Sequence, residues 1–573
     1  MRQPFRCFHT ELPFDSLALH PEVNGAARTG GKPVTGVKVR RTHVWLAQAR
    51  LPLAKVHMPL PRARGPRARG PLARAWLAGF WRQHWLISTA VGLALLPRLL
   101  AALAFRPALF TPDSFGYLAE GVHLVPGQTR PSGYPVLLRI LEPFHSLLLV
   151  TSVQHLMGIV TAVLGYAVLR RWGLPAWGGV LAACPTLFDP RVMVLESAVL
   201  PDTFYTLLVM VAVAVLLTRR GPTVGRCATA GFLLAWATIT RGNGAAAIVA
   251  VLAVLAIQRA GWRPVTAATA AFALPLLCYM AVFDLSYGNF ALTNSDGMFL
   301  WSRTMSFADC TVIKPPASLR PLCPQRQPGH PGPAPAWSLP PLLAARDPAA
   351  YLWSPGAWWR HDTHPGINQQ NNARAMSFAL AAIRAQPGGY LRTVASGVML
   401  TFLATDRSLT VRTLHFTPVP DVRRLYATQV RHLRGYARVT SDTRAVQPYA
   451  YFLYLYQQPV YFPGIVFALV LAAGLAGVIR SRRQRGGPVA LPWAVAVVGI
   501  VAPVALHEFH YRYAITAVPV ACLAAGLAFA RRPAPQPAPQ PGDAAPAMRQ
   551  WPAAGVVLTP AHLPAPPAGD LRG

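Results

Sequence analysis

Four short polar stretches, each beside a long apolar run, carry the side chains that could do chemistry. They contain Asp113; Glu196 and Asp202; Arg241 and Asn243; and His510 and Arg512. Arginine binds phosphate through paired hydrogen bonds, and a carboxylate can take a proton from an attacking hydroxyl group. The set therefore indicates group transfer from a phosphate-bearing substrate, with the carboxylates as catalytic candidates and the other four side chains as ligands of the donor phosphate.

Asp113 lies just after the first apolar run, in the stretch Thr111-Pro112-Asp113-Ser114. Thr111 suits a helix N-cap, and Pro112 suits the first helical position. Asp113 would then lie in the first turn, where the positive end of the helix favours a carboxylate. Two interpretations follow. Asp113 only stabilises this turn, or it is a base held at the membrane surface and directed toward a lipid-linked substrate.

The other polar residues also have structural interpretations, which the sequence leaves open. Arg241 and Arg512 could anchor the ends of membrane spans. Glu196 could be a solvated loop charge, and Asp202 could cap a helix. His510 could fill space at the membrane interface. Each candidate for chemistry thus has a competing structural role.

The composition is typical of a polytopic membrane protein. Of the 573 residues, 53% are hydrophobic and 13% are charged, whereas about a quarter of the residues in a soluble domain are charged. Lys and Arg number 54 against 20 Asp and Glu, a net charge of +34. No nucleic-acid-binding motif accompanies this excess, and much of it lies in short loops between apolar runs. We therefore expect anionic membrane lipid, and no nucleic acid, as a partner.

Apolar runs predict about ten membrane-spanning helices. They lie at 85–105, 144–169, 174–188, 199–217, 226–240, 245–257, 265–283, 460–479, 489–506 and 513–530. The first contains Arg98, which either faces the bundle interior or snorkels outward. A further apolar segment at 390–404 is about 15 residues long, short for a span. We interpret it as an interfacial helix or a core helix of the loop, because counting it would place the Arg-rich run 480–485 outside.

This span count, with the N-terminus inside, places the Arg clusters between spans in the cytoplasm, as the positive-inside rule requires. The prediction is a multi-pass protein of the cell membrane with both termini in the cytoplasm. The same parity puts all four polar stretches on the outer face, together with the long loop at 285–459. Their side chains could therefore meet at one membrane surface.

Changes in composition predict the order of regions along the chain. They are a disordered basic cytoplasmic arm at 1–82, an N-terminal transmembrane catalytic module of about seven spans at 83–284, an extracytoplasmic region at 285–459, a C-terminal transmembrane module of about three spans at 460–530, and a disordered Pro- and Ala-rich tail at 531–573. The expected fold class is an all-α polytopic membrane protein with a long extracytoplasmic loop region of mixed structure.

The cysteines number seven and include no closely spaced pair of the metal-binding type. Several lie in predicted spans, where cysteine behaves as a small apolar residue. Only Cys310 and Cys323 share the predicted outer loop, where an oxidising compartment allows a disulfide. We expect a disulfide between them.

Short stretches in order along the chain resemble those of polytopic GT-C glycosyltransferases. They are Pro-Asp-Ser-Phe-x-Tyr-Leu at 112–118, Arg-Pro-Ser-Gly-Tyr-Pro at 130–135, Glu196-Ser-x-x-x-x-Asp202, Thr240-Arg241-x-Asn243-Gly244 and Tyr511-Arg512-Tyr513. The likeness is to the branch related to dolichyl-phosphate-mannose protein mannosyltransferases and bacterial lipid A sugar transferases. It covers 85–283 well and 460–530 more loosely.

The resemblance implies a polyprenyl-phosphate sugar donor and transfer outside the cytoplasm, with inversion at the anomeric carbon. It maps the essential first-loop carboxylate of the family onto Asp113, and a second acidic position onto Glu196 or Asp202. Many members carry two adjacent acidic residues in the first loop, whereas this chain has Ser114 beside Asp113. Some members bind a divalent cation and others do not, so a divalent cation is a possible cofactor that the sequence leaves open.

The predicted function is transfer of a hexosyl or pentosyl group from a lipid-phosphate donor to a glycan, lipid or protein acceptor, with Asp113 as the base. A transporter or flippase of lipid-linked sugars is the alternative. Transporters usually hold polar residues near the membrane midplane in repeated halves, and this chain shows no clear repeat. A non-catalytic partner in cell-envelope assembly is a third interpretation, which likeness of fold leaves open.

Overall fold

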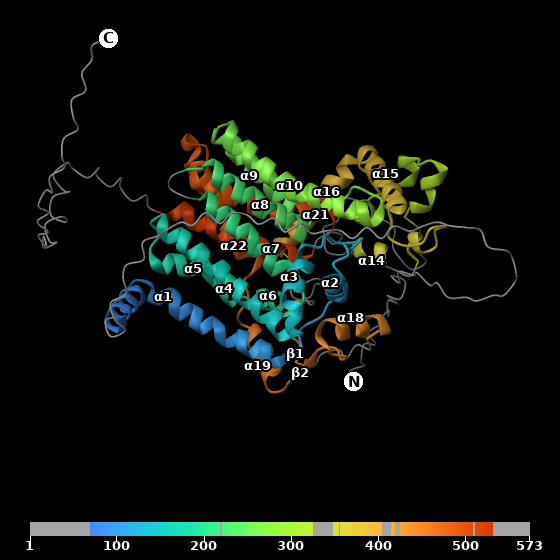
Figure 1. Cartoon of the computed structure of the whole chain (residues 1–573). Coiled ribbons are helices and arrows are strands. Elements are labelled where there is room, and N and C mark those ends of the chain that lie inside the picture. The colour runs from blue at the N-terminus through green and yellow to red at the C-terminus, as the bar shows by residue number, and fades with distance from the viewer. Residues whose placement is uncertain are drawn as a thin grey trace, which may run out of the picture. The chain divides into compact units, whose positions relative to one another are not determined.

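The computed structural model describes residues 69–217, 221–324, 348–353, 356–403, 414–418, 425–507 and 510–530. This part of the chain is almost entirely helical and includes one two-stranded antiparallel sheet (Figure 1). The predicted tail and most of the predicted basic arm lie outside the described residues. The helical class predicted from the apolar runs is confirmed.

The α-helices in chain order are α1 Arg69–Ala104, α2 Pro112–His123, α3 Gly133–Leu141, α4 Leu147–Arg171, α5 Ala176–Phe188, α6 Pro190–Ser197, α7 Asp202–Leu216, α8 Val224–Thr240, α9 Gly244–Ile257, α10 Trp262–Tyr287, α11 Asp296–Thr304, α12 Cys310–Ile313, α14 Pro348–Trp353, α15 Gln369–Ala385, α16 Pro387–Leu403, α18 Ala427–Ala437, α19 Tyr449–Gln457, α20 Gly464–Arg480, α21 Ala490–Leu506 and α22 Tyr511–Phe529. Short 3-10 helices are η2 Glu142–Phe144, η3 Ala317–Leu322, η4 Trp358–Arg360, η5 Arg482–Gln484 and η6 Gly487–Val489. The strands are β1 Phe105–Arg106 and β2 Arg444–Ala445.

Each apolar run predicted as a span coincides with a helix. Among the described residues, 5 helices are long and apolar enough to cross a membrane, namely His84–Ala104 of α1, α4, α10, Gly487–Leu506 with α21, and α22. Helices α5 and α6 form a pair bent by 50°, which raises the number to 6 if the pair is one span. The shorter apolar helices are α7, α8, α9 and α20. The chain is thus a multi-pass membrane protein, and the total of about ten spans stays a prediction.

Small residues let the apolar helices pack closely around a core formed by α4, α7, α8, α9, α21 and α22. A Cβ atom at Gly231 of α8 would lie 2.1 Å from the carbonyl oxygen of Ala268 in α10. A Cβ atom at Gly526 of α22 would lie 2.6 Å from the side chain of Leu169 in α4. Such contacts between small residues are common where helices pack in membranes. This packing fixes the ends of α7, α8 and α22, where the predicted polar residues lie.

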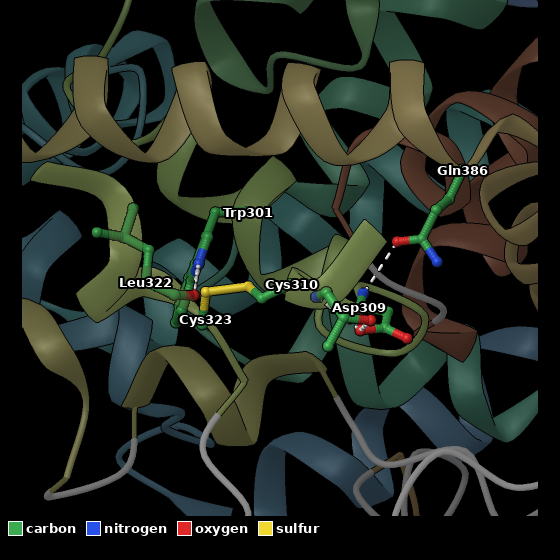
Figure 2. The surroundings of a disulfide bond; sticks show 7 residues. Trp301, Asp309, Cys310, Leu322, Cys323 and Gln386 are labelled. Atoms are coloured by element: carbon green, nitrogen blue, oxygen red, sulfur yellow. Dashed lines mark hydrogen bonds between the residues drawn. A yellow bond between two sulfur atoms is a disulfide. The ribbon is translucent and has the colours of Figure 1, made fainter. Parts of the chain in front are cut away.

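The long region between α10 and α20 forms two separate packing groups. In the first, helices α11, α12, α14 and α15 surround an aromatic core that includes Trp301 and Trp359. A disulfide joins Cys310 to Cys323, whose Cα atoms are 6.1 Å apart (Figure 2). The indole N–H of Trp301 donates a hydrogen bond to the Leu322 carbonyl at 2.9 Å, next to the disulfide. This part of the predicted loop region therefore has a core of its own.

The second group packs on the segment that carries Asp113. Helix α18 lies against α2, and the Tyr436 hydroxyl donates to the Leu138 carbonyl of α3 at 2.8 Å. Strand β2 pairs with β1 at the end of α1, and α19 packs along α1. The apolar segment expected at 390–404 forms α16, which packs against α20 and α21. The region after α10 thus braces the first loop and the last spans.

Candidate functional site

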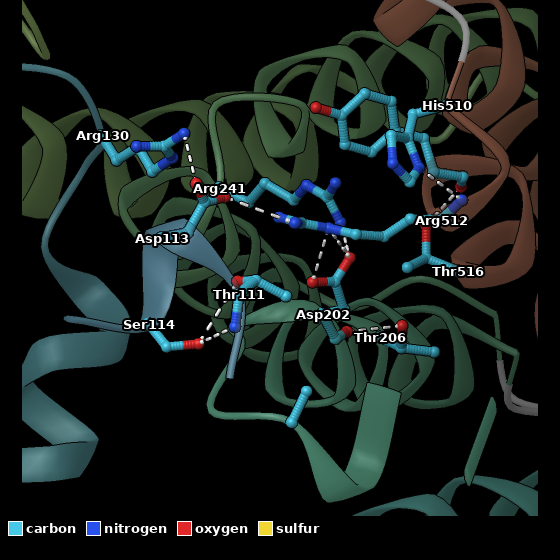
Figure 3. Close-up of polar contacts among 12 residues, drawn as sticks. Thr111, Asp113, Ser114, Arg130, Asp202, Thr206, Arg241, His510, Arg512 and Thr516 are labelled. Atoms are coloured by element: carbon cyan, nitrogen blue, oxygen red, sulfur yellow. Dashed lines mark hydrogen bonds and ion pairs between the residues drawn. The ribbon is translucent and has the colours of Figure 1, made fainter. Parts of the chain in front are cut away.

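Asp113 lies in the first turn of α2, where the sequence placed it. Pro112 occupies the first helical position, and the Ser114 hydroxyl accepts a hydrogen bond from the backbone N–H of Thr111 at 3.0 Å. Proline presets the backbone for a helix start, and the hydrogen bond to Ser114 fixes Thr111, the residue before the helix. The helix therefore begins at a defined residue, and the Asp113 side chain points toward a group of arginines (Figure 3).

Two arginines from distant parts of the chain pair with the Asp113 carboxylate. Arg130 Nη2 lies 2.8 Å from Oδ1, and Arg512 Nη1 lies 3.4 Å from Oδ2. Burial raises the pKa of Asp113, but Arg130 and Arg512 outweigh burial, so the pKa lies below its usual value. Asp113 is therefore a charged carboxylate at neutral pH, and its side chain is 19% exposed.

Asp202, the first residue of α7, is fully buried beside two guanidinium groups. Its Oδ1 pairs with Nη1 of Arg241 and accepts a hydrogen bond from Nε of Arg512 at 3.2 Å. The same Nε lies 3.1 Å from Asp202 Oδ2. Because Arg512 contacts Asp202 through Nε and Asp113 through Nη1, one guanidinium group bridges the two carboxylates (Figure 3). The structure thus brings four of the predicted site residues together.

An aromatic ring and a histidine orient these arginines. The guanidinium carbon of Arg241 lies 4.2 Å from the centre of the Tyr513 ring, and that of Arg512 lies 5.8 Å from it. Stacking of this kind holds the guanidinium plane while its edge still forms hydrogen bonds. His510 is the N-cap of α22, and its Nδ1 accepts a hydrogen bond from the backbone N–H of Arg512 at 3.2 Å. His510 therefore fixes the backbone from which Arg512 extends.

A close backbone contact holds the first loop against the end of α8. A Cβ atom at Gly133, the first residue of α3, would lie 2.6 Å from the backbone nitrogen of Thr240. Only glycine permits this approach, because any side chain would push the two segments apart. Arg130 lies just before Gly133 and Arg241 just after Thr240, so the contact brings these two arginines toward the same place.

The segment after α10 holds the other side of the same loop. The backbone N–H of Asn294 donates to the Gln128 carbonyl at 2.7 Å, and the Ser295 hydroxyl donates to the Thr129 carbonyl at 2.9 Å. These bonds fix the two residues that precede Arg130. The position of Arg130 beside Asp113 therefore depends on contacts from α3, α8 and the segment that leads into α11.

Asn243 lies at the tight turn between α8 and α9. It is the N-cap residue of α9 and is half-buried, and its side chain makes no capping hydrogen bond. A Cβ atom at Gly244 would lie 2.5 Å from the backbone nitrogen of Thr238, so the turn is closely packed. The turn keeps Asn243 near Arg241 in the chain, and a role for Asn243 as a phosphate ligand stays a prediction.

Glu196 belongs to a second, fully buried group of charges. Its Oε2 lies 2.9 Å from Arg98 Nε and 2.8 Å from His155 Nδ1. Arg98 also donates to the carbonyls of Thr186 at 3.2 Å and Leu187 at 2.7 Å, near the end of α5. The group ties α1, α4, α5 and α6 together. Arg98, the charge inside the first span, therefore faces the bundle interior.

The surroundings of Glu196 support the backbone that leads to Asp202. A Cβ atom at Gly158 would lie 1.7 Å from Glu196 Oε1, so the carboxylate rests directly on α4. The side-chain amide of Gln154 donates to the carbonyls of Glu196 at 2.8 Å and Ala198 at 2.7 Å. Glu196 is thus part of the packing behind Asp202, and it pairs with Arg98 and His155, not with the arginines that contact Asp113.

Arg130 and Glu120 also belong to this part of the structure, although the sequence analysis does not name them as site residues. Arg130 opens the Arg-Pro-Ser-Gly-Tyr-Pro stretch, so its charge was visible in a motif already recognised. Glu120 follows Asp113 by two helical turns on α2, a spacing that puts both on one face. Its carboxylate accepts a hydrogen bond from the Ser132 hydroxyl at 2.8 Å, and burial raises the pKa of Glu120 to about 8. Helical spacing from Asp113 was the available signal for Glu120.

The described residues include no group of three or more His, Cys, Asp or Glu side chains that could hold a metal ion. The carboxylates of Asp113 and Asp202 are separated by the guanidinium group of Arg512, which contacts both. This donor arrangement does not fit a metal centre.

No protein-family model matches the sequence, and no curated protein sequence matches it. Among solved structures, the Archaeoglobus fulgidus oligosaccharyltransferase in the apo form is similar at 12% identity and a TM-score of 0.37, over 78% of this chain and 51% of that chain. The archaeal oligosaccharyltransferase AglB from Archaeoglobus fulgidus, in complex with an inhibitory peptide and a dolichol-phosphate, is similar at 14% identity and a TM-score of 0.33, over 78% and 50% of the two chains. ArnT from Cupriavidus metallidurans, bound to undecaprenyl phosphate, is similar at 13% identity and a TM-score of 0.31, over 77% of each chain.

These neighbours are GT-C fold glycosyltransferases, the class that the sequence stretches resemble. The chain spans about half the length of the archaeal oligosaccharyltransferase.

Proposed function

We propose that the protein is a membrane glycosyltransferase that moves a sugar from a polyprenyl-phosphate donor to an acceptor on the extracytoplasmic face. The observation that supports this proposal most directly is the group of three arginines, Arg130, Arg241 and Arg512, around the carboxylates of Asp113 and Asp202. The group forms where α2, α7 and α22 begin and α8 ends. The headgroup of a lipid substrate could therefore reach it.

The charge balance of this group favours an anionic ligand. Its arginines outnumber its carboxylates by one. Nη2 of Arg241 is buried and has no hydrogen-bond partner among the described residues. A buried donor without a partner costs about 1–3 kcal/mol, and more when the group is charged. A phosphate oxygen would satisfy this donor, since guanidinium groups bind phosphate through paired N–H bonds.

Asp113 is the proposed base, and its basicity would depend on the donor. In the resting protein Arg130 and Arg512 keep the pKa of Asp113 below its usual value, which makes the carboxylate a weak base. A phosphate bound by the same arginines would place negative charge nearby and offset their effect. The pKa of Asp113 would then rise, so that removal of the acceptor proton is coupled to donor binding.

The proposed reaction is a single displacement with inversion. The acceptor oxygen forms a bond to the anomeric carbon while the bond from that carbon to the phosphate oxygen breaks. The polyprenyl phosphate leaves with the bonding electron pair, and the acceptor proton passes to Asp113. The arginines stabilise the charge that develops on the phosphate, so no acid is required.

The other two carboxylates have different proposed tasks. Asp202 would hold Arg241 and Arg512 in position, because it contacts both and is fully buried. Glu196 would keep α6 and the start of α7 in place through Arg98, without contacting the donor. We therefore propose Asp113 as the catalytic residue and the other two as residues that position the binding site.

Transport of a lipid-linked sugar is the second candidate function. The observation that favours it is the buried group of Arg98, His155 and Glu196 among apolar helices, because ionisable residues inside membranes often line transport pathways. Movement of a lipid-linked sugar across vesicles without transfer would support the transporter. Absence of both transfer and transport would support a non-catalytic partner in envelope assembly.

The test of the proposed function is incubation of membranes that contain the protein with radiolabelled polyprenyl-phosphate sugars. Label should move from the donor to a second molecule, and analysis of that molecule would identify the acceptor as glycan, lipid or protein. Matched membranes with Asp113→Asn protein at the same level provide the control. Equal transfer by both membranes would contradict the assignment of the base.

The orientation of the protein in the membrane needs its own test, because the proposal places the site outside the cytoplasm. A periplasmic reporter fused near Gly486, in the loop between α20 and α21, should be inactive. A reporter fused near Ala336, a position outside the described residues, should be active. The reverse result would put the site on the cytoplasmic face.

A further inference from the structure

The stretch that joins β2 to α20 is uncharged and rich in exposed aromatic side chains. From 445 to 479 the sequence contains no Asp, Glu, Lys, Arg or His. On α19, Tyr451 is 49% exposed, Phe452 51% and Tyr454 36%, and Leu455 is also exposed. Tyr461, which follows α19, is exposed as well. An exposed apolar patch of this kind is unfavourable in water and marks a contact surface.

The beginning of this stretch is fixed at the point where α1 leaves the membrane. Strand β1 follows α1 directly, and Phe105 of β1 pairs with Ala445 of β2. The backbone N–H of Val446 donates to the carbonyl of Ala104 at 2.7 Å. Because Ala104 is the last residue of the first candidate span, α19 starts at the membrane boundary on the face that carries Asp113.

The end of the stretch is fixed at the same boundary. The Tyr456 hydroxyl donates to the carbonyl of Phe188 at 2.7 Å, at the end of α5. The backbone N–H of Phe462 donates to Asp189 Oδ2 at 3.2 Å, and its carbonyl accepts from Arg191 Nη2 at 2.5 Å. The apolar helix α20 begins directly afterwards. The whole stretch therefore lies across the ends of α1 and α5.

One face of α19 is already occupied by protein. Ala450, Leu453 and Gln457 are buried, and the side chain of Gln457 makes two hydrogen bonds with the backbone of Phe416, at 2.9 and 2.7 Å. The exposed aromatic residues lie on the opposite face. The segment 445–479 adds no charge to this face, and its tyrosine hydroxyl groups suit a layer that is apolar on one side and wet on the other.

We infer that α19 and the segment to Gly464 lie in the headgroup layer of the membrane, with the exposed aromatic face in contact with phospholipid. The depth of this stretch in the membrane is fixed, because both of its ends are hydrogen-bonded to the ends of membrane helices. Tyrosine at this depth is typical of the aromatic belts of membrane proteins, and a helix with an apolar face can lie in this plane. This inference does not depend on the proposed transferase activity.

The test uses the full chain in vesicles of phosphatidylcholine and phosphatidylglycerol with a small fraction of photoactivatable phospholipid. In one preparation the diazirine lies next to the headgroup, and in the other it lies at the end of the acyl chain. After illumination, mass spectrometry of peptides locates the labelled residues. The headgroup probe should label Tyr451, Phe452, Tyr454 or Leu455 several-fold more than the chain-end probe.

The exposed residues Leu274 and Leu277 of α10 are the internal control, since a span should show the opposite ratio. Phe452→Glu should reduce labelling of α19 several-fold, whereas Gln458→Glu, which adds the same charge at the exposed residue just after the helix, should change it less. Absence of label on α19 with normal label on α10 would overturn the inference. Preferential labelling of α19 by the chain-end probe, or crosslinks between two copies through α19, would also overturn it.

Discussion

Two groups of buried or half-buried ionisable side chains in this protein both combine carboxylates with arginine, but they differ in charge balance and exposure. The first joins Asp113 and Asp202 to three arginines, carries an excess of positive charge, and leaves the Asp113 side chain 19% exposed. The second joins Glu196 to Arg98 and His155, and the Glu196 and Arg98 side chains are 0% and 2% exposed. The first has unused capacity for an anion, whereas the second holds a carboxylate within bonding distance of each of its partners.

We propose that charge balance, together with the partial exposure of Asp113, distinguishes the candidate binding site from the buried ion pair. A buried pair is sensitive to loss of one partner, because the other charge is then left uncompensated. A group with excess arginine should instead tolerate substitution as far as folding is concerned but lose affinity for its ligand.

Asp113→Asn tests the first group at its centre. The amide keeps the shape of the side chain but cannot accept the acceptor proton, so the turnover rate should fall by roughly two to four orders of magnitude. The amount of protein in the membrane should be unchanged, since a charge at a helix end contributes about 1 kcal/mol or less. Transfer assays on membranes with matched protein levels measure both. Near-native activity would remove Asp113 as the base, and parallel loss of protein would favour its structural role.

Glu196→Gln tests the second group and should affect folding before chemistry. Loss of one partner from a buried ion pair costs about 3–5 kcal/mol, so the protein level and the melting temperature in detergent should both fall. The double variant Arg98→Leu with Glu196→Leu should recover part of the loss, because no uncompensated charge remains. A stable Glu196→Gln protein with strongly reduced transfer would instead place Glu196 in the catalytic group.

Arg241→Ala should weaken donor binding, and it should affect folding less than Glu196→Gln does, because Arg512 still pairs with the buried Asp202 carboxylate. A hydrogen bond to a charged group contributes about 1.5–3 kcal/mol, which corresponds to a loss of about tenfold to a hundredfold in affinity. Binding of radiolabelled polyprenyl phosphate to purified protein measures this change. Arg263→Ala is the matched control and should bind normally, because Arg263 lies in the first turn of α10, far from the end of α8 that carries Arg241. Equal affinity for the Arg241→Ala and wild-type proteins would show that Arg241 is not a phosphate ligand.

Glu120 differs from the carboxylates of both groups, because its hydrogen-bond partner is a serine rather than an arginine. Burial raises the pKa of Glu120 to about 8, so the folded protein keeps a proton that the unfolded chain loses near pH 4.5. Stability should therefore fall as pH rises from about 4.5 to 8 and then level off. Glu120→Gln should show a smaller drop in melting temperature between pH 6 and pH 9. Identical drops would mean that Glu120 is ionised throughout this range.

The sequence by itself determined where the helices lie along the chain. Each predicted span coincides with a helix, because a segment in lipid must satisfy its own backbone hydrogen bonds and has few alternatives to a helix. Local rules also placed Asp113 in the first turn of α2, where Pro112 sets the helix start. These features depend on neighbours in sequence, so composition and motifs were sufficient for them.

Only the tertiary structure decided which polar residues meet. Arg512 contacts Asp113 across 399 positions of the chain, and Glu196, which the motifs ranked with Asp202, pairs with Arg98 instead. The spans are apolar around most of their surface, so no stripe in the sequence shows which faces pack together. Contacts between small residues set those faces, and with them the separation of one group of carboxylates into a candidate binding site and a buried ion pair.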